Sequence, residues 1–414
     1  MKEQIISNIE NPRQLEELYR DNKATFRGAF NMAYADIREH ITAQIWHERL
    51  NFETNEISWG TGRELIFVII ASFLSGLIAK IPGLAGLDPE YFYTRNVPFI
   101  VFPALSAYFL WKHHVRPQKI LIVAIAMLIP AVYINLLPDN PKSDTLILAC
   151  IHLPLFLWTV LGYAFAGDKL NSYKKRLDFL RYNGDLVVMT TLILISGGLL
   201  TAVSNGLFSL IGIHIEEFYF QYIGIWGLAA APMVGTYLVQ TNPQLVSKVS
   251  PVIAKVFTPL VLVMLTIYLV AVVYTGKDPY NDREFLLIFN LLLIGVMALI
   301  LFSVVETSKN SGGRISLFML LGLAVLTITV NGIALSAIVF RISEWGITPN
   351  RLAVLGGNVL ILANLILVTY RLFQTIRNDD SIEKVEDSIA LFLPIYGFWT
   401  ILVTFGFPLI FSFK

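Results

Sequence analysis

The chain contains eleven continuous apolar runs, and each is long enough to cross a lipid bilayer. A helix needs roughly 20 apolar residues to span a hydrocarbon core of about 30 Å. The runs lie near residues 64–82, 96–112, 119–137, 145–166, 185–213, 218–240, 253–275, 285–305, 315–341, 352–373 and 388–412. They do not alternate in polarity, which favours helices over the strands of an outer-membrane barrel. We therefore predict an all-α, polytopic transmembrane helix bundle of about eleven spans.

The composition agrees with this prediction. Of the 414 residues, 55% are hydrophobic and 15% are charged, whereas soluble domains carry about 25% charged residues. The formal net charge of +1 gives no reason to expect a nucleic-acid partner. The single cysteine, Cys150, lies in an apolar run and excludes an intrachain disulfide. The first residues lack a signal-peptide cleavage pattern, so we expect no removable leader.

The distribution of Lys and Arg predicts the orientation of the spans. With the N-terminus inside, 23 of the 31 Lys and Arg residues fall on inner segments and eight on outer segments. The outer eight are Lys80, Arg95, Lys142, Lys277, Arg283, Arg341, Arg351 and Lys414. Because cytoplasmic loops are enriched in positive charge, we expect the N-terminus inside and the C-terminus outside.

Residues 1–60 form a segment of different composition, with frequent charge and no membrane-length apolar run. Asn11 is a suitable helix N-cap, and Pro12 suits the first helical position. Apolar residues at helical spacing then predict two amphipathic helices on the membrane surface or against the cytoplasmic loops. The prediction thus divides the chain into a cytoplasmic helical segment, 1–60, and a transmembrane domain, 61–414.

Two histidines in this segment, His40 and His47, raise the question of a metal site. Both could lie on one polar helix face. Two histidines seven residues apart specify little, however, because a zinc site needs three or four ligands in a fixed arrangement. We therefore expect a solvated polar face and no metal.

Six stretches of the chain resemble a bacterial membrane family. They are "WHERLNFETNEISWGTGRELIFVIIASFLSGLIAKIPG" (46–83), "FYTRNVPFIVFP" (92–103), "HLPLFLWTVLG" (152–162), "SPVIAKVFTPL" (250–260), "DPYNDREFLLIFN" (278–290) and "EWGITPNRLAVL" (344–355). The family is catalogued as domain of unknown function 4153, here in its Bacteroidota-type form. The resemblance covers nearly the whole chain and implies a multi-pass protein of the bacterial cytoplasmic (inner) membrane. It implies no established activity.

A short motif occurs twice, as "LTAVSNG" (200–206) and "LTITVNG" (326–332). Both copies lie in spans predicted to run from inside to outside, as in a parallel internal repeat. In transporters, such repeats place helix breaks at the binding site. Asn205 and Asn331, each followed by glycine, are therefore candidate binding residues at helix breaks. The alternative is coincidence in a leucine-rich sequence.

Ionisable residues inside apolar runs need an explanation, because each costs several kcal/mol, roughly 2.5–3.5 on insertion scales. His152 lies about two turns into a span, and Pro154 frees a backbone carbonyl near it. It is a candidate proton relay or solute ligand; the alternative is a neutral imidazole bonded to a neighbouring helix. Asp185 and Glu306 are candidates at the inner face, although a carboxylate at Asp185 also suits the start of a helix.

Two predicted outer turns concentrate charge, "GKDPYNDREF" (276–285) and "RISEWGITPNR" (341–351). Their candidate binding residues are Arg283, Glu284, Arg341, Glu344 and Arg351. Arginine binds carboxylates through two parallel hydrogen bonds, so we expect a network that includes a Glu344–Arg351 pair. It would serve either as a clamp between helices or as a site for an anionic head group.

Three functions remain open on the sequence. A permease-like protein that binds or moves a small or lipidic solute is favoured by the span number and the intramembrane His152. A membrane scaffold, sensor or accessory subunit is the first alternative, and a lipid- or envelope-modifying enzyme is the second. Common ATPase, zinc-protease and hydrolase motifs are missing, which argues against an enzyme. The expected partners are membrane lipids and a small solute or anionic head group, with no cofactor.

Overall fold

The structure is a computed structural model. It describes residues 2–413 except 22, 52–58, 141, 168–171, 211–213, 244–257, 264, 268, 271–273, 275–279, 281–289, 291–292, 305–313 and 379–381. Every regular element among the described residues is a helix, which confirms the all-α class. The chain divides into two compact units, Met1–Ser58 and Trp59–Lys414.

The described residues of the smaller unit form four helices rather than the two expected. They are α1 (Lys2–Ser7), α2 (Pro12–Asp21), α3 (Lys23–Ile37) and α4 (Ile41–Asn51). Helix α2 begins at Pro12, and Asn11 Oδ1 accepts a hydrogen bond from Gln14 N at 3.2 Å, as the sequence predicted. The helices enclose their own apolar core, whose fully buried members include Phe26 and Phe30. The segment is thus a small folded unit.

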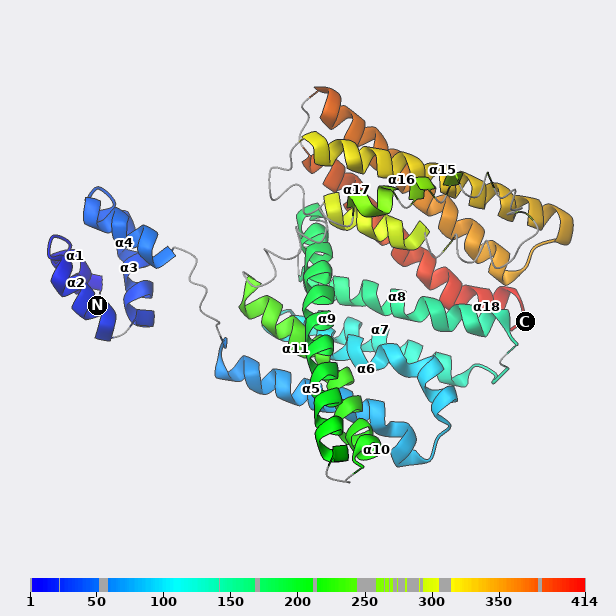
Figure 1. Cartoon of the computed structure of the whole chain (residues 1–414), viewed down its shortest axis with the longest axis horizontal. Helices are drawn as coiled ribbons and strands as arrows, with labels where there is room; N and C mark the ends of the chain where they lie inside the picture. The colour runs from blue at the N-terminus through cyan, green and yellow to red at the C-terminus, as the bar shows by residue number, and fades with distance from the viewer. Residues whose placement is uncertain are drawn as a thin grey trace. The chain divides into compact units, whose positions relative to one another are not determined.

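A first helix bundle in the larger unit comes from helices between residues 62 and 241 (Figure 1). It contains α5 (Gly62–Ala85), α6 (Pro89–Lys112), α7 (Pro117–Leu136), α8 (Asp144–Ala166) and α11 (Ile225–Thr241). Side-chain caps define three of the starts: Thr61, Asp88 and Ser143 accept hydrogen bonds from backbone N–H groups in the first turns. Such caps satisfy donors that have no partner within the helix.

A second bundle contains α15 (Arg314–Trp345), α16 (Pro349–Asn378) and α17 (Glu383–Ile401) (Figure 1). A π-helical turn, η2 (Leu402–Gly406), joins α17 to α18 (Phe407–Ile410). The core of this bundle includes leucine, isoleucine and valine side chains from the described parts of residues 258–304. The two bundles meet where α17 and η2 pack against α8.

Helix α9 (Tyr173–Leu210) connects the two bundles and runs across its neighbours rather than alongside them (Figure 1). Phe179 and Tyr182 belong to the core of the first bundle, whereas Leu180 packs against that of the second. Leu192, Leu199 and other apolar residues farther along the helix are exposed. Helix α10 (Glu216–Tyr219) and the π-helical turn η1 (Phe220–Gly224) then lead into α11.

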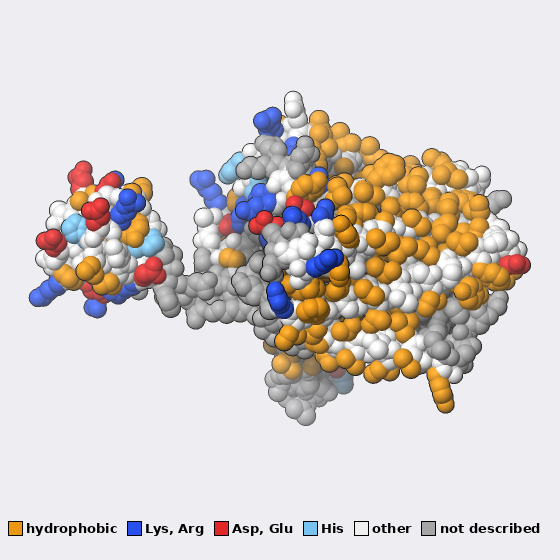
Figure 2. Space-filling view, turned by 90° about the horizontal axis from the view of Figure 1, so that it is seen from above, with side chains coloured by type: hydrophobic (Ala, Val, Ile, Leu, Met, Phe, Trp, Pro, Cys, Tyr) orange, Lys and Arg blue, Asp and Glu red, His pale blue; other side chains and the backbone are white. Residues whose placement is uncertain are grey.

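Eight helices among the described residues are long and apolar enough to span a membrane. They cover Gly62–Ala85, Pro117–Leu136, Asp144–Ala166, Tyr173–Ala202, Glu216–Thr241, Arg314–Trp345, Pro349–Asn378 and Glu383–Ile410. The protein is therefore a multi-pass membrane protein. Figure 2 shows the matching surface, with apolar side chains over most of one face of the larger unit and Lys and Arg near one end.

The other three predicted spans differ in what the structure describes. The run 96–112 lies in α6, a helix of 24 residues that also holds Arg95, Asn96 and two internal prolines and is not among the eight. The runs 253–275 and 285–305 lie largely outside the described residues. Their described parts include short apolar helices at Thr258–Ile267 and Leu293–Val304.

Candidate functional site

A groove of about 480 Å³ lies at the junction of the two bundles. Its walls come from α7, α8 and α17, and the start of α9 closes one end. Trp158, Thr159 and Tyr163 line it from α8, and Phe398 lines it from α17. Arg176, on α9, is the one Lys, Arg, Asp or Glu among the described lining residues. The site is thus an apolar groove with a guanidinium at one end.

The groove opens toward the apolar surface of the bundle. Its rim residues Ile122, Phe398 and Ile401 are 52%, 67% and 42% exposed. Its floor is tightly packed: a Cβ on Gly397 would lie 3.2 Å from Thr159 Cγ2, and one on Gly162 would lie 3.0 Å from Phe179 Cε1. Because the rim is exposed and apolar, a ligand can enter from the lipid phase.

The polar groups of the floor bond within the protein. Trp158 Nε1 donates to Asn183 Oδ1 at 2.9 Å, and Thr159 Oγ1 donates to Phe156 O at 2.7 Å. At the end of the groove, Arg176 Nη1 donates to Ala390 O at 3.3 Å. The floor therefore offers contact surface more than hydrogen bonds, and a ligand would be recognised mainly by its apolar part and by its charge.

Positive charge gathers beyond this end of the groove. The Lys119 ammonium lies 4.2 Å from the centre of the Tyr163 ring and donates to Gly167 O. Nearby, the pKa of His113 is lowered, first by partial burial and then by the ammonium groups of Lys175, Lys112 and Lys119. A histidine whose pKa several lysines lower lies in a positive electrostatic potential.

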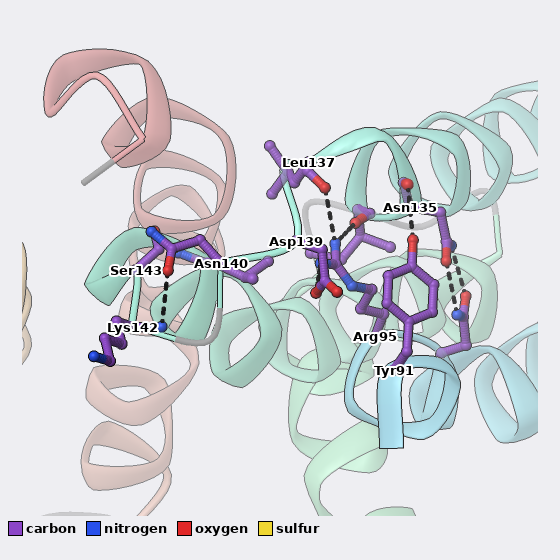
Figure 3. Close-up of polar contacts among 11 residues, drawn as sticks. Tyr91, Arg95, Asn135, Leu137, Asp139, Asn140, Lys142 and Ser143 are labelled. Atoms are coloured by element: carbon purple, nitrogen blue, oxygen red, sulfur yellow. Dashed lines mark hydrogen bonds and ion pairs between the residues drawn. The ribbon is translucent and has the colours of Figure 1, made fainter. Parts of the chain in front are cut away.

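A second arginine, Arg95, lies in a different environment (Figure 3). It is 2% exposed. Its Nη1 donates to Ile134 O at 2.7 Å and to Leu137 O at 3.2 Å, and its Nη2 lies 3.1 Å from Asp139 Oδ1. These carbonyls end α7 and have no partner within the helix. The guanidinium therefore caps α7 from α6.

Neighbouring polar side chains extend this cap (Figure 3). Asn96 and Asn135 exchange two amide hydrogen bonds of 2.9 and 2.8 Å. Tyr91 donates to Asn135 O at 3.2 Å, and its ring centre lies 4.5 Å from the guanidinium carbon of Arg95. We call this set, Tyr91, Arg95, Asn96, Asn135 and Asp139, the α6–α7 clamp. The sequence pattern marks Arg95 only as an outer charge and does not predict the clamp.

Two ion pairs at the predicted inner level also join helices. Lys112 Nζ lies 3.0 Å from Glu64 Oε1, and the Tyr108 hydroxyl donates to the same oxygen at 2.5 Å. Arg181 Nη2 lies 2.6 Å from Glu386 Oε1 and so joins α9 to α17. These pairs also went unnoticed in the sequence, because their partners lie 48 and 205 positions apart.

The intramembrane candidate His152 bonds within its own helix. Its Nδ1 lies 2.9 Å from Leu148 O. Because a carbonyl only accepts, Nδ1 carries a proton and Nε2 of the neutral ring is an acceptor. His152 is half-buried and does not line the groove.

The candidate asparagines lie on different helices, Asn205 on α9 and Asn331 on α15. Asn331 is fully buried, and its amide donates to Asn358 O at 3.1 Å. Both copies of the repeated motif are continuous helix, so the expected helix breaks are wrong. Glycine in a helix costs only about 1 kcal/mol, which packing against neighbouring helices offsets.

The outer-turn candidates bond to backbone carbonyls. Arg351 Nη1 donates to Trp345 O at 2.9 Å and to Gly346 O at 2.7 Å, and Arg341 Nε donates to Tyr280 O at 2.8 Å. Glu344 is exposed. Within the described residues the expected Glu344–Arg351 ion pair does not form, because the carbonyls ending α15 are nearer acceptors.

The other candidates are Arg283, Glu284, Glu306 and Asp185. Arg283, Glu284 and Glu306 lie outside the described residues. Asp185 is half-buried on α9. In the part of the chain that the structure describes, no group of three or more His, Cys, Asp or Glu side chains is arranged to hold a metal ion.

Comparisons with known proteins do not assign the chain to a family. No protein-family model, curated protein or solved structure matches it. The function must therefore be argued from the groove, the charges around it and the clamp.

Proposed function

We propose that the chain is a permease-like protein of the bacterial cytoplasmic membrane, and that its ligand is an amphiphile held in the groove. The groove at the bundle junction carries this proposal. Ligand sites are concave, mostly apolar and often lie between helices, with volumes of about 300–1,000 Å³. The apolar lining favours a lipidic solute over a small polar one.

The two-bundle arrangement supports movement of this ligand. Many transporters work by rocking one bundle against another around a site at their interface. Here α17 and α8 form opposite walls of the groove, so a rotation of one bundle changes the width of the groove. Within this proposal, α9 and the Arg181–Glu386 pair keep the bundles connected at one end.

The proposal includes the topology and family expected from the sequence: eleven spans, the N-terminus inside, the C-terminus outside, and membership of the bacterial family that the chain resembles. Its support is that polar contacts join residues of the same predicted level. Arg95 and Asp139 are both outer, as are Arg341 and Tyr280, whereas Glu64 and Lys112 are both inner.

A lipid-movement assay tests the function. The purified protein is reconstituted into vesicles that carry a fluorescent phospholipid, and dithionite then bleaches the label of the outer leaflet. We expect bleaching beyond the outer-leaflet fraction with the natural chain, and a reduced rate with Gly397→Leu, which fills the floor. The control is Gly227→Leu, where an added Cβ meets open space. Equal bleaching with and without protein contradicts transport.

A scaffold or sensor is the second candidate, and the separate smaller unit favours it. A unit with its own core offers a surface for a protein partner. Deleting residues 1–58 distinguishes the two functions, because a permease retains lipid movement without them. The enzyme has less support, since Glu344, the described carboxylate of the predicted outer-face candidates, is exposed and Arg351 bonds to backbone carbonyls instead of to it.

A further inference from the structure

We infer that the groove selects an anionic phospholipid of the inner leaflet, with an acyl chain between α8 and α17 and the phosphate near Arg176. This inference rests on the proposed function, because it names the ligand class of the same groove. It concerns a specific site rather than the general lipid contact of a membrane protein.

The first argument is the polarity of the groove along its length. Trp158, Thr159 and Phe398 provide a wall of rings and methyl groups, whereas Arg176 lies at the end formed by α9. A phospholipid has the same order of groups along its length, an apolar acyl chain followed by a phosphate. Arginine suits that phosphate because its guanidinium donates two parallel hydrogen bonds.

The second argument is the charge around this end. The Tyr163 ring forms part of the groove wall, and the Lys119 ammonium lies 4.2 Å from the centre of that ring. Lys175 adds further charge at His113, whereas Lys112 is paired with Glu64. Two described carboxylates of this region, Asp178 and Glu386, both lie within ion-pair distance of Arg181. The potential at the groove end is therefore positive and favours a net negative head group over a zwitterionic one.

The third argument is location. The end of α6, the start of α7, the end of α8 and the start of α9 lie at one predicted level, on the side where the chain places most of its Lys and Arg. Anionic lipids in the cytoplasmic leaflet are attracted to such basic segments. The exposed rim residues Ile122 and Ile401 leave the apolar part open to that leaflet.

Site-specific photocrosslinking tests the inference. Benzoylphenylalanine replaces Phe398 in one full-length variant and Ile395 in another, in vesicles of phosphatidylethanolamine and phosphatidylglycerol. Ile395 is a matched control, because it lies on the same helix, is 39% exposed and does not line the groove. After irradiation, mass spectrometry identifies the lipids bound to each position.

We expect stronger capture at position 398 than at 395, with phosphatidylglycerol enriched about tenfold over its share in the vesicle. Tenfold corresponds to about 1.4 kcal/mol, close to one hydrogen bond to a charged group. Arg176→Gln should return the captured lipids to the vesicle composition. Arg371→Gln, which removes an arginine at the same predicted level on α16, should leave the enrichment unchanged.

Two results overturn different parts of the account. Strong capture at 398 with the composition of the vesicle contradicts the head-group selection and leaves the amphiphile groove in place. Capture at 398 no stronger than at 395 contradicts the groove itself, and with it the proposed function. Enrichment that survives Arg176→Gln also contradicts the inference, because the selectivity then has another source.

Discussion

Arg95 and Arg176 are two arginines at opposite predicted faces of the larger unit, and they differ in what surrounds them. Arg95 is 2% exposed, and two helix-end carbonyls, a carboxylate and an aromatic ring surround its guanidinium. Arg176 is half-buried and lies at the end of a groove that opens to the lipid phase.

This difference indicates two different roles for an arginine whose burial costs free energy. A buried cation must be paired and hydrogen-bonded to be tolerated, and Arg95 meets this requirement within the chain. Its burial therefore indicates a role in stability. Arg176 also bonds within the chain, to Ala390 O, but it lies beside a volume of about 480 Å³, and under our proposal it binds the ligand there.

Cysteine labelling tests whether Arg95 and Arg176 lie at opposite faces of the membrane, and its result is all or none. In a Cys150→Ser background, Lys142→Cys lies near the clamp and Lys174→Cys lies near Arg176. Both positions are exposed. An impermeant thiol reagent added to intact cells should label residue 142 and not residue 174. Labelling at 174 but not at 142 would reverse the orientation, and labelling at both would place the arginines at one face.

Removing Arg95 should have the largest effect on stability. Arg95→Met leaves Ile134 O and Leu137 O without their donor, and each buried unsatisfied group costs about 1–3 kcal/mol. We expect a loss of about 3 kcal/mol in the free energy of unfolding, measured by thermal unfolding in detergent. Arg176→Gln should cost less than about 1 kcal/mol. Equal losses would remove the distinction between a clamp and a binding residue.

Two adjacent glycines on α16 differ in how closely they pack against Trp399 of α17. A Cβ on Gly356 would lie 2.0 Å from Trp399 Cη2, whereas one on Gly357 would lie 4.0 Å from Trp399 Nε1. Overpacking costs about 1–3 kcal/mol, so Gly356→Ala should lower the unfolding temperature clearly. Gly357→Ala should leave it nearly unchanged. If both variants match the natural chain, α16 and α17 are not closely packed there.

The smallest expected effect concerns His113. Burial and three lysines lower its pKa below the usual 6.5. The unfolded chain therefore takes up a proton before the folded one, and stability falls as the pH drops from about 6.5 toward the folded pKa. Lys175→Gln should raise the His113 pKa toward 6.5, as read by NMR of labelled histidine. Without an upward shift, the cluster near the groove is not strongly positive.

The sequence was sufficient to predict features that depend on local pattern. Continuous apolar runs predicted membrane helices, and Asn11 with Pro12 predicted the start of α2, because helix length and capping involve neighbouring residues. Contacts between distant helices could not be derived in this way. The groove is formed by α8 and α17, which lie far apart in the chain. The clamp forms because the loop between α6 and α7 reverses the chain and brings the end of α7 next to Arg95.

The failed expectations have a physical reason as well. The predicted Glu344–Arg351 pair was based on the preference of arginine for a carboxylate partner. Gly346, at φ +75°, ends α15 and leaves carbonyls within reach of Arg351, which binds them instead. Likewise Asn331 packs into a continuous helix, where its amide reaches Asn358 O. In each case a donor of a side chain that the sequence suggested was functional bonds to a backbone carbonyl, although Asn331 Oδ1 is buried without a hydrogen-bond partner.

Cryo-electron microscopy of the protein in lipid nanodiscs containing phosphatidylglycerol would show whether the groove holds a lipid. We predict elongated density along Trp158 and Thr159, between α8 and α17, that ends in a head group near Arg176, while the clamp around Arg95 holds no ligand. A groove filled by the side chains of Phe398 and Ile122, with no lipid density, would contradict the account.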